Sequence, residues 1–191
     1  MNFVGPATQL EDKDIAEVAE ALGCDAAAVQ AVCDVEAAGA GFLDDGRPKI
    51  LFEAHVFGRL TDHQYDDEHP NVSAPAWDRS LYGKPGAHQY DRLAEAMALD
   101  EPAALKAASW GMFQVMGMNH KACGFDTVQE FVAALVRGER AQLDAFAKFC
   151  QSTSAANSLR THNWTAFART YNGPGQVDAY ASRLREAYDP A

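Results

Sequence analysis

The most informative segment of this chain is Asp25-Ala-Ala-Ala-Val-Gln-Ala-Val-Cys-Asp-Val-Glu36. It predicts a helix, because Val29, Val32 and Cys33 precede Glu36 by seven, four and three positions. That spacing places side chains on one helix face. Asp25 is a residue type that favours the start of a helix. The final glutamate therefore lies on an apolar face, where a charged carboxylate is poorly solvated.

Two effects are expected to raise the pKa of the Glu36 carboxyl. Apolar surroundings disfavour its charged form. Ala37-Ala-Gly39-Ala-Gly41 then supplies glycines that end the helix, which leaves the acid at the negative end of the helix dipole. An acid that stays protonated near neutral pH can give a proton to a departing sugar oxygen, as cleavage of a glycosidic bond requires. From this segment alone, a surface glutamate that only ends a helix is an equally good interpretation.

Residues 41–52 predict a β-hairpin, because two short apolar runs flank Asp44-Asp45-Gly46. Either aspartate is a candidate for a second acid, although Asp-Asp-Gly is also ordinary turn chemistry. Glu53 lies 17 residues after Glu36, at the foot of the second run, from which an acid can point into a cleft. Its alternative role is that of an acid at a helix N-terminus, where the dipole favours it.

The rest of the chain predicts a mostly helical protein. Residues 110–118 are apolar nearly all round, which is expected of a central helix. Residues 62–89 form a long polar loop, and a loop of that length in a compact domain is usually functional or mobile. Residues 1–9 form an N-terminal extension. Further helices are expected over 12–22, 53–60, 90–99, 102–109, 128–137, 140–151, 164–171 and 176–188.

Further motifs point to a family. Ser109-Trp-Gly-Met-Phe-Gln114 is similar to the Ser-x-Gly-x-x-Gln element of goose-type lysozymes and lytic transglycosylases, and Tyr171-Asn172-Gly173 is similar to their Tyr-Asn-Gly element. Together with Glu36-Ala-Ala-Gly-Ala-Gly-Phe42 and Ile50-Leu-Phe-Glu-Ala-His-Val-Phe57, they resemble the N-acetylmuramidase catalytic domain of modular phage endolysins. The resemblance runs from about residue 10 to about residue 188. It implies a lysozyme-like fold, mainly α with a small β-hairpin.

The resemblance also implies an activity and its site residues. The family is expected to hydrolyse the β-1,4 bond between N-acetylmuramic acid and N-acetylglucosamine, with Glu36 as general acid, Glu53 as second acid, and neither cofactor nor metal. The implied substrate-binding residues are Asp44, Asp45, His55, Ser109, Gln114, Tyr171 and Asn172. Two alternatives stay open. One is a lytic transglycosylase, which closes the muramic acid onto itself instead of admitting water, and the other is a non-catalytic wall-binding protein on the same fold.

Composition bounds the class of protein and its partners. A chain of 191 residues that is 48% hydrophobic is expected to form one domain over residues 1–191 with a substantial core, without a separate peptidoglycan-binding module. The net charge of −11 disfavours nucleic acid, because phosphate binding needs a basic face. The expected partner is the peptidoglycan glycan strand, met by a monomer. Cell walls are themselves anionic, so long-range repulsion opposes this encounter.

The sequence also predicts where the protein is made and acts. It has no apolar run of the roughly 18 residues that a membrane span needs, and its first residues lack the features of a signal peptide. We expect synthesis in the cytoplasm, no membrane insertion, and action in the periplasm or cell wall after release by a holin or another route.

Overall fold

The computed structural model describes residues 1–36 and 40–189. Within them, ten α-helices, two 3₁₀ helices and three short strands follow one another along the chain. Their order is α1 Asp12–Leu22, α2 Ala26–Glu36, β1 Ile50–Phe52, α3 Ala54–Leu60, η1 Arg79–Tyr82, α4 His88–Leu99, α5 Glu101–Lys106, β2 Ala108–Trp110, β3 Val115–Met116, η2 Gly117–Asn119, α6 Val128–Leu135, α7 Glu139–Ser152, α8 Ala155–Arg160, α9 Trp164–Asn172 and α10 Val177–Tyr188.

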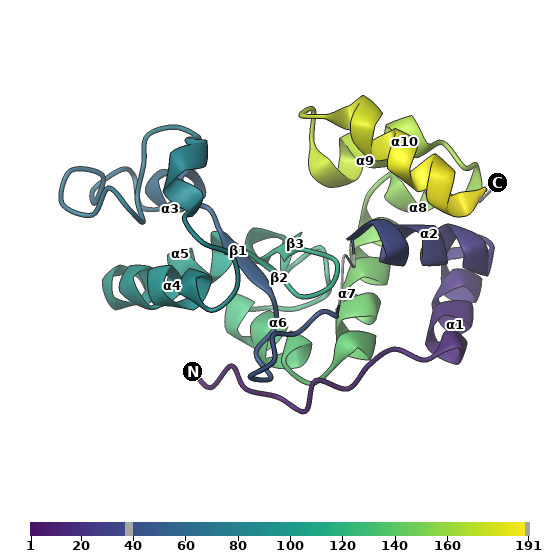
Figure 1. The fold of residues 1–191 in the computed structure, drawn as a ribbon, viewed down its shortest axis with the longest axis horizontal. Helices are drawn as coiled ribbons and strands as arrows, with labels where there is room; N and C mark the ends of the chain where they lie inside the picture. Colours follow the sequence, from purple (N-terminus) through teal and green to yellow (C-terminus); the bar gives the residue numbers. More distant parts are fainter. Residues whose placement is uncertain (37–39, 190–191) are drawn as a thin grey trace.

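The helices fall into two groups on either side of α7 (Figure 1). On one side, α2 packs against α1 and α10, and α9 packs against α10 and α8. On the other side, α4 packs against α5 and β1, so that this group is built around the small sheet. Helix α7 contacts α1, α6 and α8 and thereby joins the groups. One cluster of buried apolar residues runs through both of them.

Helix α2 forms as its sequence predicts. The Asp25 carboxylate accepts a hydrogen bond of 2.8 Å from the backbone N–H of Ala28, which satisfies one of the free donors of the first turn. Val29, Val32 and Cys33 are buried, and the helix ends at Glu36. Gly39, which the sequence offers as a helix stop, lies outside the described residues. The acid at position 36 is therefore held at the C-terminal end of a helix whose apolar face is in the core.

The sheet has the order β1-β2-β3 and is antiparallel throughout. Leu51 is paired with Ser109, and Ser109 is paired with Met116. The hairpin predicted for residues 41–52 is confirmed only near its turn. There, Phe42 and Pro48 form an antiparallel bridge, and the Leu43 N–H donates to the Arg47 carbonyl oxygen at 2.7 Å. Strand β1, which is the second apolar run, pairs instead with residues 108–110, which are distant in the chain. Strand β1 is paired with a strand far along the chain, and a pattern of neighbouring residues cannot reveal such a partner.

The central helix predicted for residues 110–118 is also wrong. This segment ends β2, turns, forms β3 and continues into η2. Gly111 and Gln114 have φ values of 70° and 48°, a left-handed backbone that a helix cannot include. The continuous apolar pattern arises because both faces of this short hairpin are buried, and such a run cannot be told from a buried helix by periodicity. Helix α5 accordingly ends at Lys106 and not at Ser109 as expected.

Most other helix boundaries agree with the sequence, whereas α8 was not foreseen. Residues 62–87 contain turns and the 3₁₀ helix η1, and α4 begins within the predicted loop, at His88. The N-terminal segment packs on the body, with Phe3 stacked on Trp110 at 5.7 Å between ring centroids. No described helix combines the length and apolar character that crossing a membrane would need.

Candidate active site

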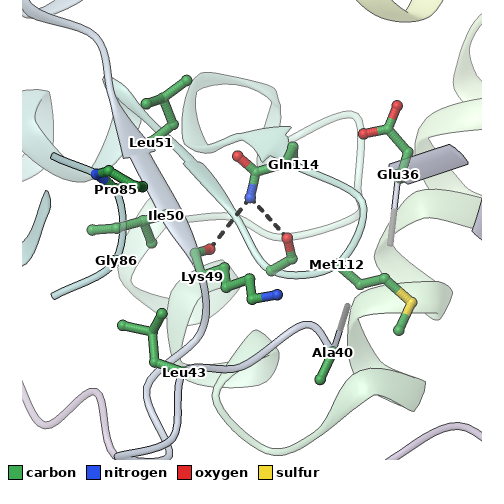
Figure 2. A pocket seen from close by; sticks show the side chains of 11 residues that line it. Glu36, Ala40, Leu43, Lys49, Ile50, Leu51, Pro85, Gly86, Met112 and Gln114 are labelled. Atoms are coloured by element: carbon green, nitrogen blue, oxygen red, sulfur yellow. Dashed lines mark hydrogen bonds between the residues drawn. The ribbon is translucent and has the colours of Figure 1, made fainter. Parts of the chain in front are cut away.

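A pocket of about 530 Å³ lies between the end of α2 and strand β1 of the small sheet (Figure 2). Glu36 enters it from the end of α2, and Ile50 and Leu51 enter from β1. The turn between β2 and β3 forms the floor. The remaining lining residues are Ala40, Leu43, Lys49, Pro85, Gly86, Gly111, Met112 and Gln114. The walls are therefore mostly apolar, with one carboxyl, one ammonium and one amide among them.

Glu36 is partly buried, and burial raises the pKa of its carboxyl above the usual value, as the sequence predicts. The phenol of Tyr180 on α10 donates a hydrogen bond to Glu36 Oε1. This bond and the nearby Arg183 guanidinium both favour the charged form and limit the rise in pKa. Burial raises the pKa of the nearby Tyr171 phenol, and the negative charge of the Glu36 carboxylate raises it further.

The floor of the pocket is fixed by hydrogen bonds of the β2–β3 turn. The Gln114 Nε2 group donates to the carbonyl oxygens of Gly111 at 2.8 Å and Lys49 at 3.4 Å (Figure 2). Its Oε1 accepts from the Ser109 hydroxyl at 2.8 Å. These bonds use both N–H groups of the amide. Gln114 therefore lines the pocket as expected, with its amide already engaged. Ser109 is buried in strand β2 and does not line the pocket itself, but it contacts two residues that do, Gln114 and its strand partner Leu51.

Helix α7 holds the segments that flank Glu36. The buried Glu139 carboxylate accepts from the backbone N–H of Gly41 at 2.6 Å, and Gln142 Oε1 accepts from the N–H of Met112 at 2.6 Å. The Gln142 side chain also lies so close to positions 41 and 111 that both must be glycine. A Cβ atom would lie 2.3 Å from Gln142 Oε1 at position 41 and 2.4 Å from its Cδ at position 111. Two side chains one helical turn apart thus fix the chain after Glu36 and the turn opposite it.

Tyr171 ties α9 to the same turn. Its hydroxyl donates to the carbonyl oxygen of Phe113, and its ring stacks on Phe167 at 5.3 Å between centroids. It does not line the pocket of Glu36. Asn172 is exposed at the end of α9, also outside that pocket.

Asp44 and Asp45 lie beside the pocket and do not line it. Both are exposed. Asp45 accepts from Arg47 Nη2 at 2.6 Å and from the Arg47 backbone N–H at 3.1 Å, and the guanidinium holds the pKa of this carboxyl below its usual value. The Arg47 guanidinium in turn lies over the Tyr90 ring, at 4.2 Å from its centroid. Asp45 therefore has the role of a turn residue, which was the alternative for this sequence.

Glu53 belongs to a separate, very small cavity behind β1, together with His55, Tyr82 and Arg92. Its Oε2 accepts from the Tyr82 hydroxyl at 2.7 Å and lies 3.5 Å from His55 Nδ1. The structure does not bring Glu53 and His55 into the pocket that Glu36 lines. Glu53 is instead the residue before the first turn of α3, as its alternative interpretation has it, although its side chain makes no capping bond.

Tyr82 connects Glu53 to one wall of the pocket. The amide of the buried Gln89 donates to the carbonyl oxygens of Tyr82 at 2.6 Å and Lys84 at 2.9 Å. Pro85 and Gly86, which follow directly, line the Glu36 pocket. Glu53 and Gln89 thus fasten the segment that supplies this wall.

Several site residues escaped sequence reasoning: Lys49, Met112, Glu139, Gln142 and Tyr180. Tyr180 and Glu36 are 144 positions apart, so no local pattern could pair them. Glu139 is an acid in the first turn of a helix, a position that the helix dipole favours for surface acids. The sequence therefore gives no sign that its side chain is buried. In the described part of the chain, no three His, Cys, Asp or Glu side chains are grouped to hold a metal ion.

A mostly helical body, a small antiparallel sheet and a glutamate at a helix end beside a pocket define a lysozyme-like protein. Residues 25–191 match the N-acetylmuramidase family. The crystal structure of an endolysin from Burkholderia AP3 phage aligns with a TM-score of 0.86 and 38% sequence identity, over 95% of this chain and 70% of that chain. A comparison with curated proteins found no match.

This chain belongs to the N-acetylmuramidase family. It is a glycoside hydrolase of the peptidoglycan-cleaving type, with the lysozyme-like fold of a phage endolysin.

Proposed function

We propose that this protein hydrolyses the β-1,4 bond after N-acetylmuramic acid with Glu36 as the general acid. The observation that carries the proposal is the position of Glu36, a partly buried carboxyl with a raised pKa that lines the apolar pocket (Figure 2). Cleavage requires a proton on the departing sugar oxygen, and a raised pKa favours the protonated form of the carboxyl that supplies it.

Tyr180 assigns different tasks to the two oxygens of the Glu36 carboxyl. Oε1 accepts a hydrogen bond from the Tyr180 hydroxyl. The acidic proton is therefore carried by Oε2, the oxygen that remains free to face a ligand. After transfer of that proton, the Tyr180 hydroxyl and the Arg183 guanidinium stabilise the carboxylate. Tyr180 is therefore a positioning residue for the acid.

The rest of the pocket suits an N-acetylated sugar. Leu43, Ile50, Leu51 and Met112 offer apolar surface to ring C–H groups and to the acetyl methyl group. The Lys49 ammonium extends into the pocket between Gln114 and Met112, where it can donate to sugar or carboxylate oxygens (Figure 2). Gln114 retains one free lone pair on Oε1 for a donor of the substrate.

We assign Glu53 a supporting role. It holds Tyr82, and through the same segment the wall formed by Pro85 and Gly86, whereas the attack on the sugar is left to water. This differs from the role of second acid that the family resemblance suggested. Only Glu36 of this pair lines the pocket, so the distance between the two carboxyls does not distinguish retention from inversion.

Mass spectrometry of the fragments released from purified peptidoglycan tests the reaction. Hydrolysis gives muramic acid reducing ends, whereas transglycosylation gives 1,6-anhydro ends that are lighter by one water. We expect reducing ends with the wild-type protein and release slowed by about a hundredfold or more with Glu36→Gln. Predominant anhydro ends would overturn the hydrolytic assignment, and release at the wild-type rate by Glu36→Gln would overturn the role of the acid. Because the substrate lies in the periplasm or cell wall, we expect the protein to act there.

A further inference from the structure

Trp77 is the exposed tryptophan of this chain. It has 59% of its surface open to solvent, whereas Trp110 and Trp164 are exposed by 1% and 4%. A large apolar ring left in water gains nothing for folding, so an exposed tryptophan is a candidate contact surface for a ligand.

The indole of Trp77 is held in one orientation. Its Nε1–H group donates to the Tyr82 hydroxyl oxygen at 2.8 Å, and the two rings meet edge to face with centroids 6.4 Å apart. The Tyr82 hydroxyl donates onward to Glu53 Oε2 at 2.7 Å. Burial and the Glu53 carboxylate raise the pKa of Tyr82 to about 12, so this hydroxyl keeps its proton at neutral pH. A ring fixed in this way loses little conformational freedom when a ligand covers it.

A groove of about 620 Å³ runs beside the ring and mixes apolar with polar groups. Pro70, Pro75 and Leu81 supply apolar surface, whereas Asp78 and Arg79 supply an acceptor and a donor. A pyranose has the matching chemistry, because its C–H face packs on an aromatic ring while hydroxyl and acetamido groups at its edge form hydrogen bonds.

The groove and the Glu36 pocket share one segment of chain. Trp77 and Asp78 lie before η1, Tyr82 ends it, and Pro85 and Gly86 continue into the wall of the pocket. A glycan strand is a long polymer, so sugars on either side of the bond to be cleaved must extend beyond the pocket of Glu36.

We propose that Trp77 and the groove beside it form an accessory binding site for the N-acetylated, β-1,4-linked glycan strand. The site is separate from the pocket in which the bond is cleaved. The inference rests on the proposed function in taking the glycan as ligand. It gives this acidic domain a short-range means of holding an anionic wall polymer through stacking, which does not depend on net charge.

Tryptophan fluorescence tests this directly, because iodide in solution reaches Trp77 and not the two buried indoles. The probes are peptide-free glycan strands, made by removing the stem peptides from peptidoglycan, and the free stem peptide in a separate arm. The protein is the full chain carrying Glu36→Gln, so that bound strands are not degraded. We expect the strands to protect the fluorescence from iodide and the stem peptide to have no effect.

Variants then test the ring itself. Trp77→Ala is expected to weaken strand binding about three- to tenfold, the range of a single aromatic contact. Trp77→Phe should keep most of the affinity, which separates loss of stacking from loss of folding. Val4→Ala is the matched control, because Val4 is exposed by 53% on the N-terminal segment.

Three results would overturn the site: no protection by the strands, equal protection by the stem peptide, or wild-type affinity in Trp77→Ala. Each leaves the role of Glu36 untouched, since binding is measured without turnover. Conversely, lysis at the wild-type rate by Glu36→Gln would remove the proposed acid and leave the binding result standing.

Discussion

Glu36 and Glu53 lie 17 residues apart and differ in almost every physical respect. Glu36 ends a helix beside an open pocket, and burial raises the pKa of its carboxyl. Its one described hydrogen bond comes from Tyr180. Glu53 precedes a helix and lines a cavity too small for a sugar, which Arg92 also lines. There its carboxylate accepts from the Tyr82 hydroxyl and lies beside His55.

One residue type serves two purposes in this molecule because its surroundings differ. An acid that must deliver a proton needs one oxygen free toward the ligand and surroundings that penalise its charge. An acid that must hold a loop needs partners that satisfy its charge. The substitution of glutamate by glutamine separates these two purposes, because an amide still accepts hydrogen bonds but cannot act as a general acid.

The largest expected effect is at Glu36. Glu36→Gln should lower lysis of peptidoglycan by about a hundred- to ten-thousandfold, the usual contribution of general acid catalysis, with the melting temperature nearly unchanged. Turbidity of purified cell walls measures the rate. Asp34→Asn, an exposed change on the same helix, is the control and should keep the wild-type rate. Equal rates in wild-type and Glu36→Gln proteins would exclude Glu36 as the general acid.

The next effect is at Tyr180, through the pH profile. Glu36 works while protonated, so activity is present below its folded-state pKa and is lost as pH rises through it. Tyr180→Phe removes a hydrogen bond that lowers this pKa, so the alkaline limb should move to higher pH and the maximal rate should fall several-fold. Tyr188→Phe is the matched control, because its hydroxyl faces Asp25 at 3.3 Å from the same helix. An unmoved limb in Tyr180→Phe would show that Tyr180 has only a packing role.

A smaller effect on lysis is expected at Glu53. Glu53→Gln should retain lysis within about tenfold, below the range of a lost general acid. Glu53→Ala should lower the free energy of unfolding by about 1.5–3 kcal/mol, the range for a lost hydrogen bond to a charged group. Urea unfolding and wall turbidity measure the two quantities. If a folded Glu53→Gln protein had no lytic activity, Glu53 would be a reacting acid and not a supporting residue.

The smallest effect is expected in the 43–47 turn. Asp45→Asn should cost less than about 1 kcal/mol, because its ion pair with Arg47 is exposed, and lysis should stay near wild type. The Arg47 guanidinium lowers the pKa of Asp45, so this contribution is present above the unfolded pKa and is lost as pH falls through the folded one. Asp44→Asn should leave the free energy of unfolding unchanged, as urea unfolding would measure, because Asp44 is exposed. Collapse of lysis in either variant would place an essential acid in this turn.

Local patterns in the sequence determined the parts of this protein that depend on near neighbours. The apolar spacing and cap of residues 25–36 gave helix α2 and the partial burial of Glu36. The motifs at 109–114 and 171–173 indicated the family, which the match over residues 25–191 confirms. These features were readable because helix periodicity, caps and short motifs operate over a few residues.

Tertiary structure alone decided which distant groups meet. It paired β1 with β2 across 58 positions, brought Tyr180 to Glu36, and left Trp77 exposed while Trp110 and Trp164 were buried. It also placed Glu53 in a small cavity apart from the pocket that Glu36 lines. A residue's type gives its chemistry, but burial and partners come from packing of segments far apart in the chain, and these set the pKa and the free lone pairs on which function depends.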